Sequence, residues 1–259
     1  MSEAVPKAIR PDLSERVVWI SGAGRGLGRS AAVHLARCGA IVGVSDIDAA
    51  ACAETAQVIR EAGGLAHALP ADVSDRDQVF EATATLAERT GRIDAVLNNA
   101  SLLVYEKLED VRPETVNKMI GVGIEGALWG SQALLKHYHR DRGGVIVNFA
   151  SPVAFRGSPT TSVYSSIKGA LVSLTRVLAA ELGPAGVRVN AVAPGSVPTP
   201  GALKYVNQAE YERRARTIPL RRLGQESDVD HALAFLLSDE ATFINGTILH
   251  IDGGIVAAA

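Results

Sequence analysis

Short apolar segments alternate along this chain with longer segments in which hydrophobic residues recur at helical spacing. The apolar segments are rich in β-branched residues, as in Val17, Val18 and Ile20, which is typical of strands buried on both faces. Strands are predicted at residues 16–20, 41–45, 65–69, 94–98, 145–149, 187–192 and 247–251, and helices at 27–38, 49–62, 76–90, 113–140, 162–182 and 226–237. This alternation predicts an α/β fold with one parallel, seven-stranded sheet covered by helices on both faces. No linker or repeat divides the chain, so we interpret residues 1–259 as a single domain with a polar N-terminal extension at 1–14.

One long segment, residues 195–219, interrupts the alternation and begins where a predicted strand ends. It is rich in proline, and long irregular segments in compact α/β domains are usually functional, so we expect a lid over a substrate. A solvated surface insertion is the alternative. Five arginines lie in or just after it, at positions 213, 214, 216, 221 and 222. Ion pairs with Glu210 and Glu212 on a solvated helix face explain these arginines better than an anionic substrate or acyl carrier does.

Composition narrows the class of protein. The formal net charge is −2, which gives no reason to expect nucleic acid or an anionic membrane surface as a partner. No apolar run approaches the roughly 20 residues that cross a bilayer. Two cysteines are too few for a disulfide framework, which favours a reducing, cytoplasmic location. No spacing of histidine and cysteine indicates a metal site.

Candidate cofactor chemistry begins after the first strand. The sequence SGAGRGLG at residues 21–28 opens directly into a helix, where glycines allow positive φ and let backbone amides approach a pyrophosphate. Asp46 ends the second strand about 20 residues later, where a carboxylate can accept both ribose hydroxyls of NAD. Asp48 is better placed than Asp46 to cap the next helix. Arg25 could instead meet the 2′-phosphate of NADP, but Asp46 would touch the ribose directly and repel that phosphate. NAD is therefore favoured.

Candidate catalytic chemistry lies on the helix predicted at 162–182. Tyr164 and Lys168 are four residues apart, so their side chains share one helix face. A free phenol loses its proton near pH 10, and a neighbouring ammonium would lower that pKa and could also bind a ribose. Ser151 follows the fifth strand at its carboxyl end, where α/β sheets place ligands, and could hold a substrate oxygen.

Together these motifs resemble the short-chain dehydrogenase/reductase family, and the resemblance runs from about Val17 to Gly254. The matching motifs are Ser21-Gly22-x-x-x-Gly26-x-Gly28, Asp72-Val73, Asn98-Asn99-Ala100, Ser151, Tyr164-x-x-x-Lys168, Asn190, Pro194-Gly195 with Thr199, and Asp252-Gly253-Gly254. The resemblance implies a Rossmann-type, doubly wound sheet and an oxidoreductase. Members are commonly tetramers, so a homotetramer is expected.

The resemblance also assigns roles to residues. Ser151 would orient the substrate, Tyr164 would act as the acid/base, and Lys168 would bind the nicotinamide ribose and lower the pKa of Tyr164. The cofactor-binding residues would be Gly22, Arg25, Gly26, Leu27, Gly28, Asp46, Asp72, Val73, Asn99, Ala100, Tyr164, Lys168, Pro194, Gly195, Val197 and Thr199.

The sequence departs from the family at two positions. Ser101 stands where the family usually has glycine, which would narrow the space near the nicotinamide. Gly123 stands where many members have an asparagine that completes a catalytic tetrad. We expect glycine to keep the helix kink and the carbonyl there, so that a proton relay through water to Lys168 survives. An asparagine substituted at 123 should then change kcat by less than about tenfold.

Apolar residues fall in loops that the family places around the substrate. The candidate pocket residues are Leu102, Val153, Phe155 and Tyr205. The leading hypothesis is hydride transfer between NAD(H) and a hydrophobic secondary alcohol or ketone. An NADPH-dependent ketone or 3-oxoacyl reductase is the first alternative. A weakly catalytic NAD-binding sensor or scaffold is the second, supported only by the departures at Ser101 and Gly123.

Overall fold

The computed structural model describes residues 11–201, 203 and 206–258. Its strands are β1 (Val17–Ser21), β2 (Ile41–Ser45), β3 (Leu65–Ala68), β4 (Ala95–Asn98), β5 (Gly144–Phe149), β6 (Val187–Pro194) and β7 (Ile248–Ile251). They form one sheet in the order β3-β2-β1-β4-β5-β6-β7, in which every neighbouring pair is parallel. This is the predicted Rossmann-type, doubly wound arrangement. The strand order reverses between β1 and β4, where such sheets bind ligands.

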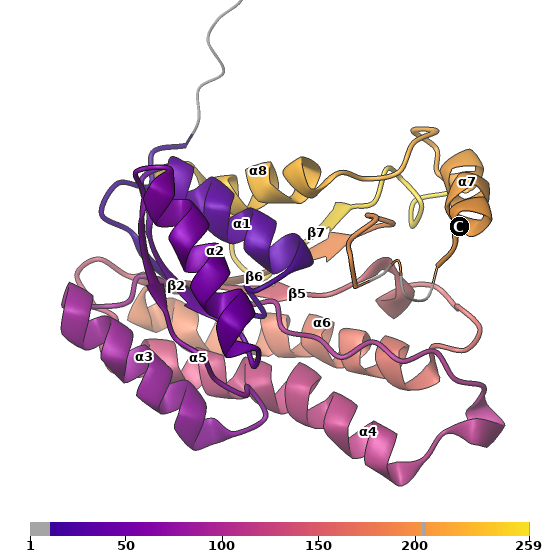
Figure 1. The fold of residues 1–259 in the computed structure, drawn as a ribbon, viewed down its shortest axis with the longest axis horizontal. Helices are drawn as coiled ribbons and strands as arrows, with labels where there is room; N and C mark the ends of the chain where they lie inside the picture. Colours follow the sequence, from indigo (N-terminus) through magenta and orange to yellow (C-terminus); the bar gives the residue numbers. More distant parts are fainter. Residues whose placement is uncertain (1–10, 202, 204–205, 259) are drawn as a thin grey trace, which may run out of the picture.

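Helices cover both faces of the sheet (Figure 1). The helices are α1 (Gly26–Arg37), α2 (Ala49–Glu61), α3 (Arg76–Thr90), α4 (Pro113–Ile120), α5 (Gly126–His137), α6 (Ser162–Leu182), α7 (Gln208–Thr217) and α8 (Glu226–Leu237). α1, α2 and α8 lie over one face and α3 to α6 over the other. A hydrophobic core lies on each face of the sheet, and alternate side chains of β1 belong to one core or the other. Val18 and Ile20 pack beneath α1, and Val17 and Trp19 pack on the opposite face. None of the helices in the described ranges is long and apolar enough to cross a membrane.

The single helix expected over 113–140 is wrong, because the structure divides it. A π-helical turn, η2 (Gly121–Glu125), separates α4 from α5, and α5 ends at His137, before the extended backbone of Tyr138. A π turn adds one residue to the helical circuit and bends the axis, and glycine at 121, 123 and 126 makes this segment permissive. The predicted break from regular helix at Gly123 thus takes the form of a π turn.

The segment 195–219 contains a helix that its irregular, proline-rich start did not suggest. α7 begins after Asn207, whose side chain accepts from the Glu210 amide at 2.9 Å and caps the helix. Glu210 pairs with Arg213 at 2.7 Å and with Arg214 at 2.8 Å, as expected for a solvated helix face. Glu212 instead accepts from Gln208 at 3.3 Å.

Candidate active site

The turn between β1 and α1 depends on glycine because other backbone lies against it. Gly22 and Gly26 have φ of +64° and +53°, in the left-handed region. A Cβ on Gly28 would lie 2.2 Å from the Gly22 carbonyl oxygen and 2.4 Å from Asn99 Nδ2, so no side chain fits there. No described side chain caps the start of α1. The turn therefore presents a bare helix N-terminus, a shape and charge that suit a pyrophosphate.

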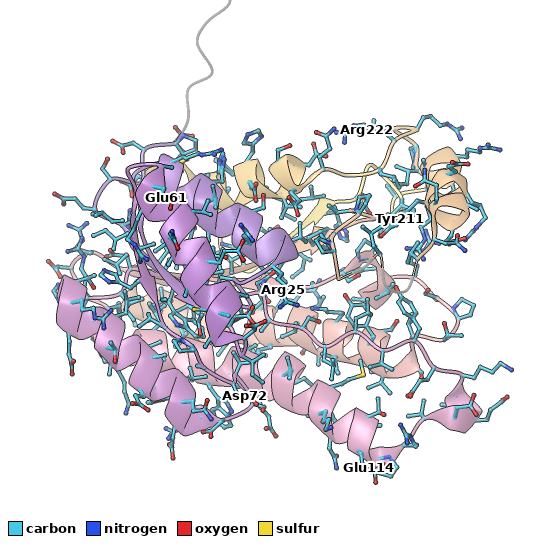
Figure 2. The ribbon with its side chains drawn as sticks, in the orientation of Figure 1. Arg25, Glu61, Asp72, Glu114, Tyr211 and Arg222 are labelled. Atoms are coloured by element: carbon cyan, nitrogen blue, oxygen red, sulfur yellow. The ribbon has the colours of Figure 1, made fainter. Side chains whose placement is uncertain are left out.

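Asp46 is held at the end of β2 by backbone amides. Its Oδ2 accepts from the Gly24 N–H at 2.9 Å and its Oδ1 from the Asp48 N–H at 3.0 Å. Asp48 caps α2 as predicted, accepting from the amides of Ala50 and Ala51. Asp48 also pairs with the guanidinium of Arg25, which lies beside the start of α1 (Figure 2). The Asp46 carboxylate is thus held in place, and the Arg25 guanidinium is paired with Asp48.

The end of β4 braces the glycine turn. Asn99 Nδ2 donates to the carbonyls of Ser21 and Gly22 at 2.8 and 2.9 Å, and the Ala100 amide donates to Ser21 Oγ at 3.1 Å. Asn98 points into the core and donates to Asn148 Oδ1 at 2.8 Å. The side chain of Asn99 is therefore committed to the fold, which leaves the main chain of 99–100 to contact a cofactor.

Two further predicted cofactor residues lie between β3 and α3, and a third lies on α1. Asp72 Oδ1 accepts from the Ser74 amide and hydroxyl at 2.9 and 2.7 Å, and Val73 is buried against Gly126. Leu27 packs on the core beneath α1. Leu27 and Val73 thus place their side chains in apolar packing, so their contact with a cofactor would come mainly from the backbone.

The segment after β6 closes over the glycine turn. The Gly195 amide donates to the Ile251 carbonyl at 2.9 Å, which ties the segment to β7 just beyond Pro194. Val197 is buried. A Cβ on Gly26 would lie 3.3 Å from Thr199 Cβ, so Thr199 sits directly above the turn. The predicted cofactor-binding residues that follow β1 and those that follow β6 thus lie together at the glycine turn.

The three predicted catalytic residues converge at the carboxyl end of β5. Ser151 follows that strand, and its hydroxyl lies near enough to Tyr164 of α6 to lower the pKa of that phenol. Lys168 Nζ lies 5.5 Å from the centre of the Tyr164 ring and donates to the Phe149 carbonyl at 2.6 Å. Ser151 and Lys168 are buried. An alcohol oxygen placed beside Ser151 would therefore also meet the Tyr164 hydroxyl.

The expected lowering of the Tyr164 pKa is not what the structure shows. Burial raises the pKa of Tyr164 to about 12, the nearby phenol of Tyr105 adds to the increase, and the nearby Ser151 hydroxyl only partly opposes it. Burial also lowers the pKa of Lys168 to about 8. The ammonium is aimed at a backbone carbonyl rather than at the phenol oxygen, so in this structure it does not offset the loss of water around Tyr164.

The predicted substrate pocket is partly visible. Leu102 and Phe155 are exposed, Val153 lies two residues after Ser151, and Tyr205 lies outside the described residues. The Phe155 ring stacks edge-to-face on His250 of β7, with centroids 4.6 Å apart. Sequence reasoning missed His250, because nothing in its local pattern links β7 to the loop after β5.

Sequence reasoning also missed Tyr211, which is the buried residue of α7 and lies on its inner side (Figure 2). The phenol of Tyr105 is near enough to raise the pKa of both Tyr164 and Tyr211. The Tyr211 hydroxyl is buried and has no hydrogen-bond partner among the residues described. A single aromatic residue within an otherwise polar helix is the signal that could have found it.

Comparison with known proteins places this chain among oxidoreductases. A family model described as enoyl-(acyl carrier protein) reductase matches residues 22–256. Levodione reductase of Leifsonia aquatica is 34% identical over 95% of this chain and 96% of its own, and cyclopentanol dehydrogenase of Comamonas sp. is 32% identical over 95% and 98%. The crystal structure of 3-ketoacyl-(acyl-carrier-protein) reductase from Brucella melitensis complexed with NADH is 32% identical, with a TM-score of 0.87 over 95% of this chain and 100% of that one. With its motifs in one site and these relatives along nearly its whole length, the chain belongs to the short-chain dehydrogenase/reductase family of oxidoreductases.

Proposed function

We propose that the protein transfers a hydride between NAD(H) and a hydrophobic secondary alcohol or ketone, with Tyr164 as acid/base. The observation that carries the choice of NAD is the fixed carboxylate of Asp46 beside the glycine turn. A 2′-phosphate next to it would meet like charge, worth about 4 kcal/mol at 4 Å and an effective dielectric constant of 20. Arg25 is paired with Asp48, which weakens the case for NADP.

The residues of this chain account for binding and proton transfer. The glycine turn and Asp46 would hold the pyrophosphate and the adenosine ribose, and the bound nicotinamide would supply or accept the hydride. Ser151 donates a hydrogen bond to the substrate oxygen, and Tyr164 exchanges the proton at the same oxygen. With a pKa of about 12, Tyr164 keeps its proton near neutrality, so before a cofactor binds it is set up to protonate a ketone oxygen. Alcohol oxidation requires the filled site to lower that pKa.

The substrate class follows from the apolar surroundings of Ser151. Val153 and Phe155 follow Ser151 in the same loop, and the exposed Leu102 follows the end of β4. One relative is named for a cyclic secondary alcohol, cyclopentanol. We therefore infer an apolar, cyclic or aromatic secondary alcohol as the substrate rather than a sugar.

Cofactor preference tests the proposal. We expect kcat/KM with NAD to exceed that with NADP by at least about 100-fold, near 2.7 kcal/mol. Asp46→Ala should shrink this ratio mainly by raising the KM for NAD. Asp48→Ala is the matched control, because it releases Arg25 but leaves Asp46 in place. Equal use of both cofactors by the parent enzyme would contradict the proposal and would mean that Arg25 offsets the repulsion from Asp46.

Similarity to a 3-ketoacyl-(acyl-carrier-protein) reductase favours one second candidate, a ketone or 3-oxoacyl reductase. It makes a different prediction for the same assay. Such an enzyme would reduce an acyl-thioester ketone faster than it oxidises any simple alcohol, and an NADPH-dependent one would prefer NADPH. A non-catalytic NAD sensor has no physical need for Ser151, Tyr164 and Lys168 together, and it would turn over neither substrate.

A further inference from the structure

A close packing contact joins the π turn η2 to the catalytic helix. Gly123 lies in η2 and is buried, and a Cβ on it would lie 2.5 Å from Ile167 Cγ2. The Cβ and Cδ1 of Ile167 would each lie 3.8 Å from the same point. Carbon atoms at optimal separation are about 3.5–4.0 Å apart, so Ile167 already occupies the space of any side chain at 123. Ile167 is itself buried, at 4% exposure.

Ile167 lies on α6 between the two catalytic residues of that helix. Ile167 immediately precedes Lys168, and Tyr164 lies one turn earlier. The Ile167 side chain packs against η2, while the Lys168 side chain reaches the Phe149 carbonyl at the end of β5. Adjacent residues thus tie α6 to two different elements, one by apolar packing and the other by a charged hydrogen bond.

We propose that Ile167 is a positioning residue: fitted against the bare backbone of Gly123, it sets the depth of α6 between η2 and β5, so that Lys168 and Tyr164 keep their places. The catalytic consequence rests on the proposed function, but the packing does not. Protein interiors are close-packed, so an added or removed methyl at this contact must shift a neighbour or leave a void. Ile167 belongs to α6, so a shift of its backbone moves the helix that carries both catalytic side chains.

This contact revises one expectation from the sequence. An asparagine at 123 was expected to change kcat by less than about tenfold, because glycine keeps the carbonyl and the kink. The structure has no room there even for a Cβ, so Gly123→Asn must displace Ile167. Whether position 123 accepts a larger residue therefore depends on the residue at 167 as well.

A double-mutant cycle tests the pair. Gly123→Ala should lower kcat by about tenfold or more, because the new methyl pushes against Ile167 Cγ2. Adding Ile167→Ala removes that atom and should recover at least half of the loss on a logarithmic scale. Ile167→Val is the matched control, because valine keeps both γ carbons and should give no recovery. Losses that simply add in the double variant would overturn the proposal, since uncoupled sites are additive.

A second measurement does not depend on turnover. The chain has six lysines, so an NMR titration of ε-13C-lysine, assigned by the signal lost in Lys168→Arg, can follow Lys168 alone. Its pKa is held at about 8 by burial. Ile167→Ala should loosen that burial and raise the Lys168 pKa by about half a unit or more, whereas Ile167→Val should leave it unchanged. An unchanged Lys168 pKa in folded Ile167→Ala would contradict the positioning role.

Failure of the proposed function would look different. If the parent enzyme oxidises no alcohol and reduces no ketone, the proposed activity is wrong, while the Lys168 titration still decides the inference. The same cycle measured on the free energy of unfolding supports coupling if Ile167→Ala rescues Gly123→Ala and Ile167→Val does not. If Gly123→Ala does not fold, recovery of folding in Gly123→Ala/Ile167→Ala also supports the coupling of the two residues. No recovery of folding in the double variant contradicts the coupling.

Discussion

On the cofactor side of the site, residues 21–28, 46 and 98–100, the geometry is fixed by closely packed backbone and by side chains hydrogen-bonded to that backbone. On the substrate side, residues 101–107, 151–155 and 206–217, it is fixed by side chains in loops and by α7. The difference is clear in two glycines. Gly28 of the cofactor side has no room for a Cβ, whereas Gly201, just before the substrate side's α7 segment, would meet nothing within 4 Å. The cofactor side therefore tolerates little change, and the substrate side can vary while the fold persists.

The largest effect should come from adding one methyl group on the cofactor side. Gly28→Ala would place a carbon 2.2 Å from the Gly22 carbonyl oxygen, so the turn must open. We expect loss of NAD binding by about 100-fold or more, and a loss of stability of about 1–3 kcal/mol from overpacking. Calorimetric titration with NAD and urea unfolding measure the two effects. Gly201→Ala is the matched control and should change neither; similar losses in both variants would remove the contrast.

A buried acid behind the glycine turn gives the next effect. Asp230 of α8 accepts from Ser30 Oγ of α1 at 2.6 Å, and its other oxygen has no partner among the described residues. Burial raises the pKa of Asp230 to about 6, above the ordinary 3.8. Between these two pH values, Asp230 is therefore more often protonated in the folded state than in the unfolded state. Stability is therefore fully retained below about pH 4 and falls as the pH rises towards 6, by on the order of 2 kcal/mol.

Asp230→Asn stays neutral and should lack this fall, which makes it more stable than the parent at pH 7. Urea unfolding of both proteins from pH 4 to 8 gives the difference directly. Asp77→Asn, at an exposed position on α3, should follow the parent curve. A parent and an Asp230→Asn variant whose curves run parallel would show that Asp230 titrates normally.

The smallest effect should come from the substrate side. Tyr211→Phe removes a buried hydroxyl that has no partner among the described residues. Because burying an unpaired hydroxyl costs about 1–3 kcal/mol, its removal should leave the free energy of unfolding unchanged or raise it by up to about 1 kcal/mol. Urea unfolding measures this. A clear loss of stability would mean that the hydroxyl is bonded and that the substrate side is as tightly fixed as the cofactor side.

The same contrast explains what the sequence could predict. The glycine turn, Asp46 and the alternation of the strands with the helices other than α7 follow from local rules of backbone geometry and hydrophobic period, and they were predicted. The contact of Phe155 with His250 and the inward position of Tyr211 depend on which loops meet in space, which no local pattern encodes. The break between α4 and α5 was expected only as a kink at Gly123, because a π turn depends on packing against α6.

Electrostatics also escaped the sequence. Spacing predicted correctly that Tyr164 and Lys168 share one face of α6, but not that burial would outweigh their interaction. The pKa of a side chain depends on how deeply it is buried and on which groups the neighbouring hydrogen-bond donors contact. Lys168 is aimed at the Phe149 carbonyl, a partner that only the assembled sheet provides.

The most direct test of the account is turnover of apolar secondary alcohols with NAD by the parent enzyme and by Tyr164→Phe, side by side. Replacing Tyr164 by phenylalanine removes only the hydroxyl, so the variant should fold and bind NAD with a Kd within about twofold of the parent. Its kcat should fall by about 100-fold or more, the usual scale of general acid–base catalysis. A Tyr164→Phe enzyme that folds, binds NAD and turns over near the parental rate would contradict the proposed mechanism.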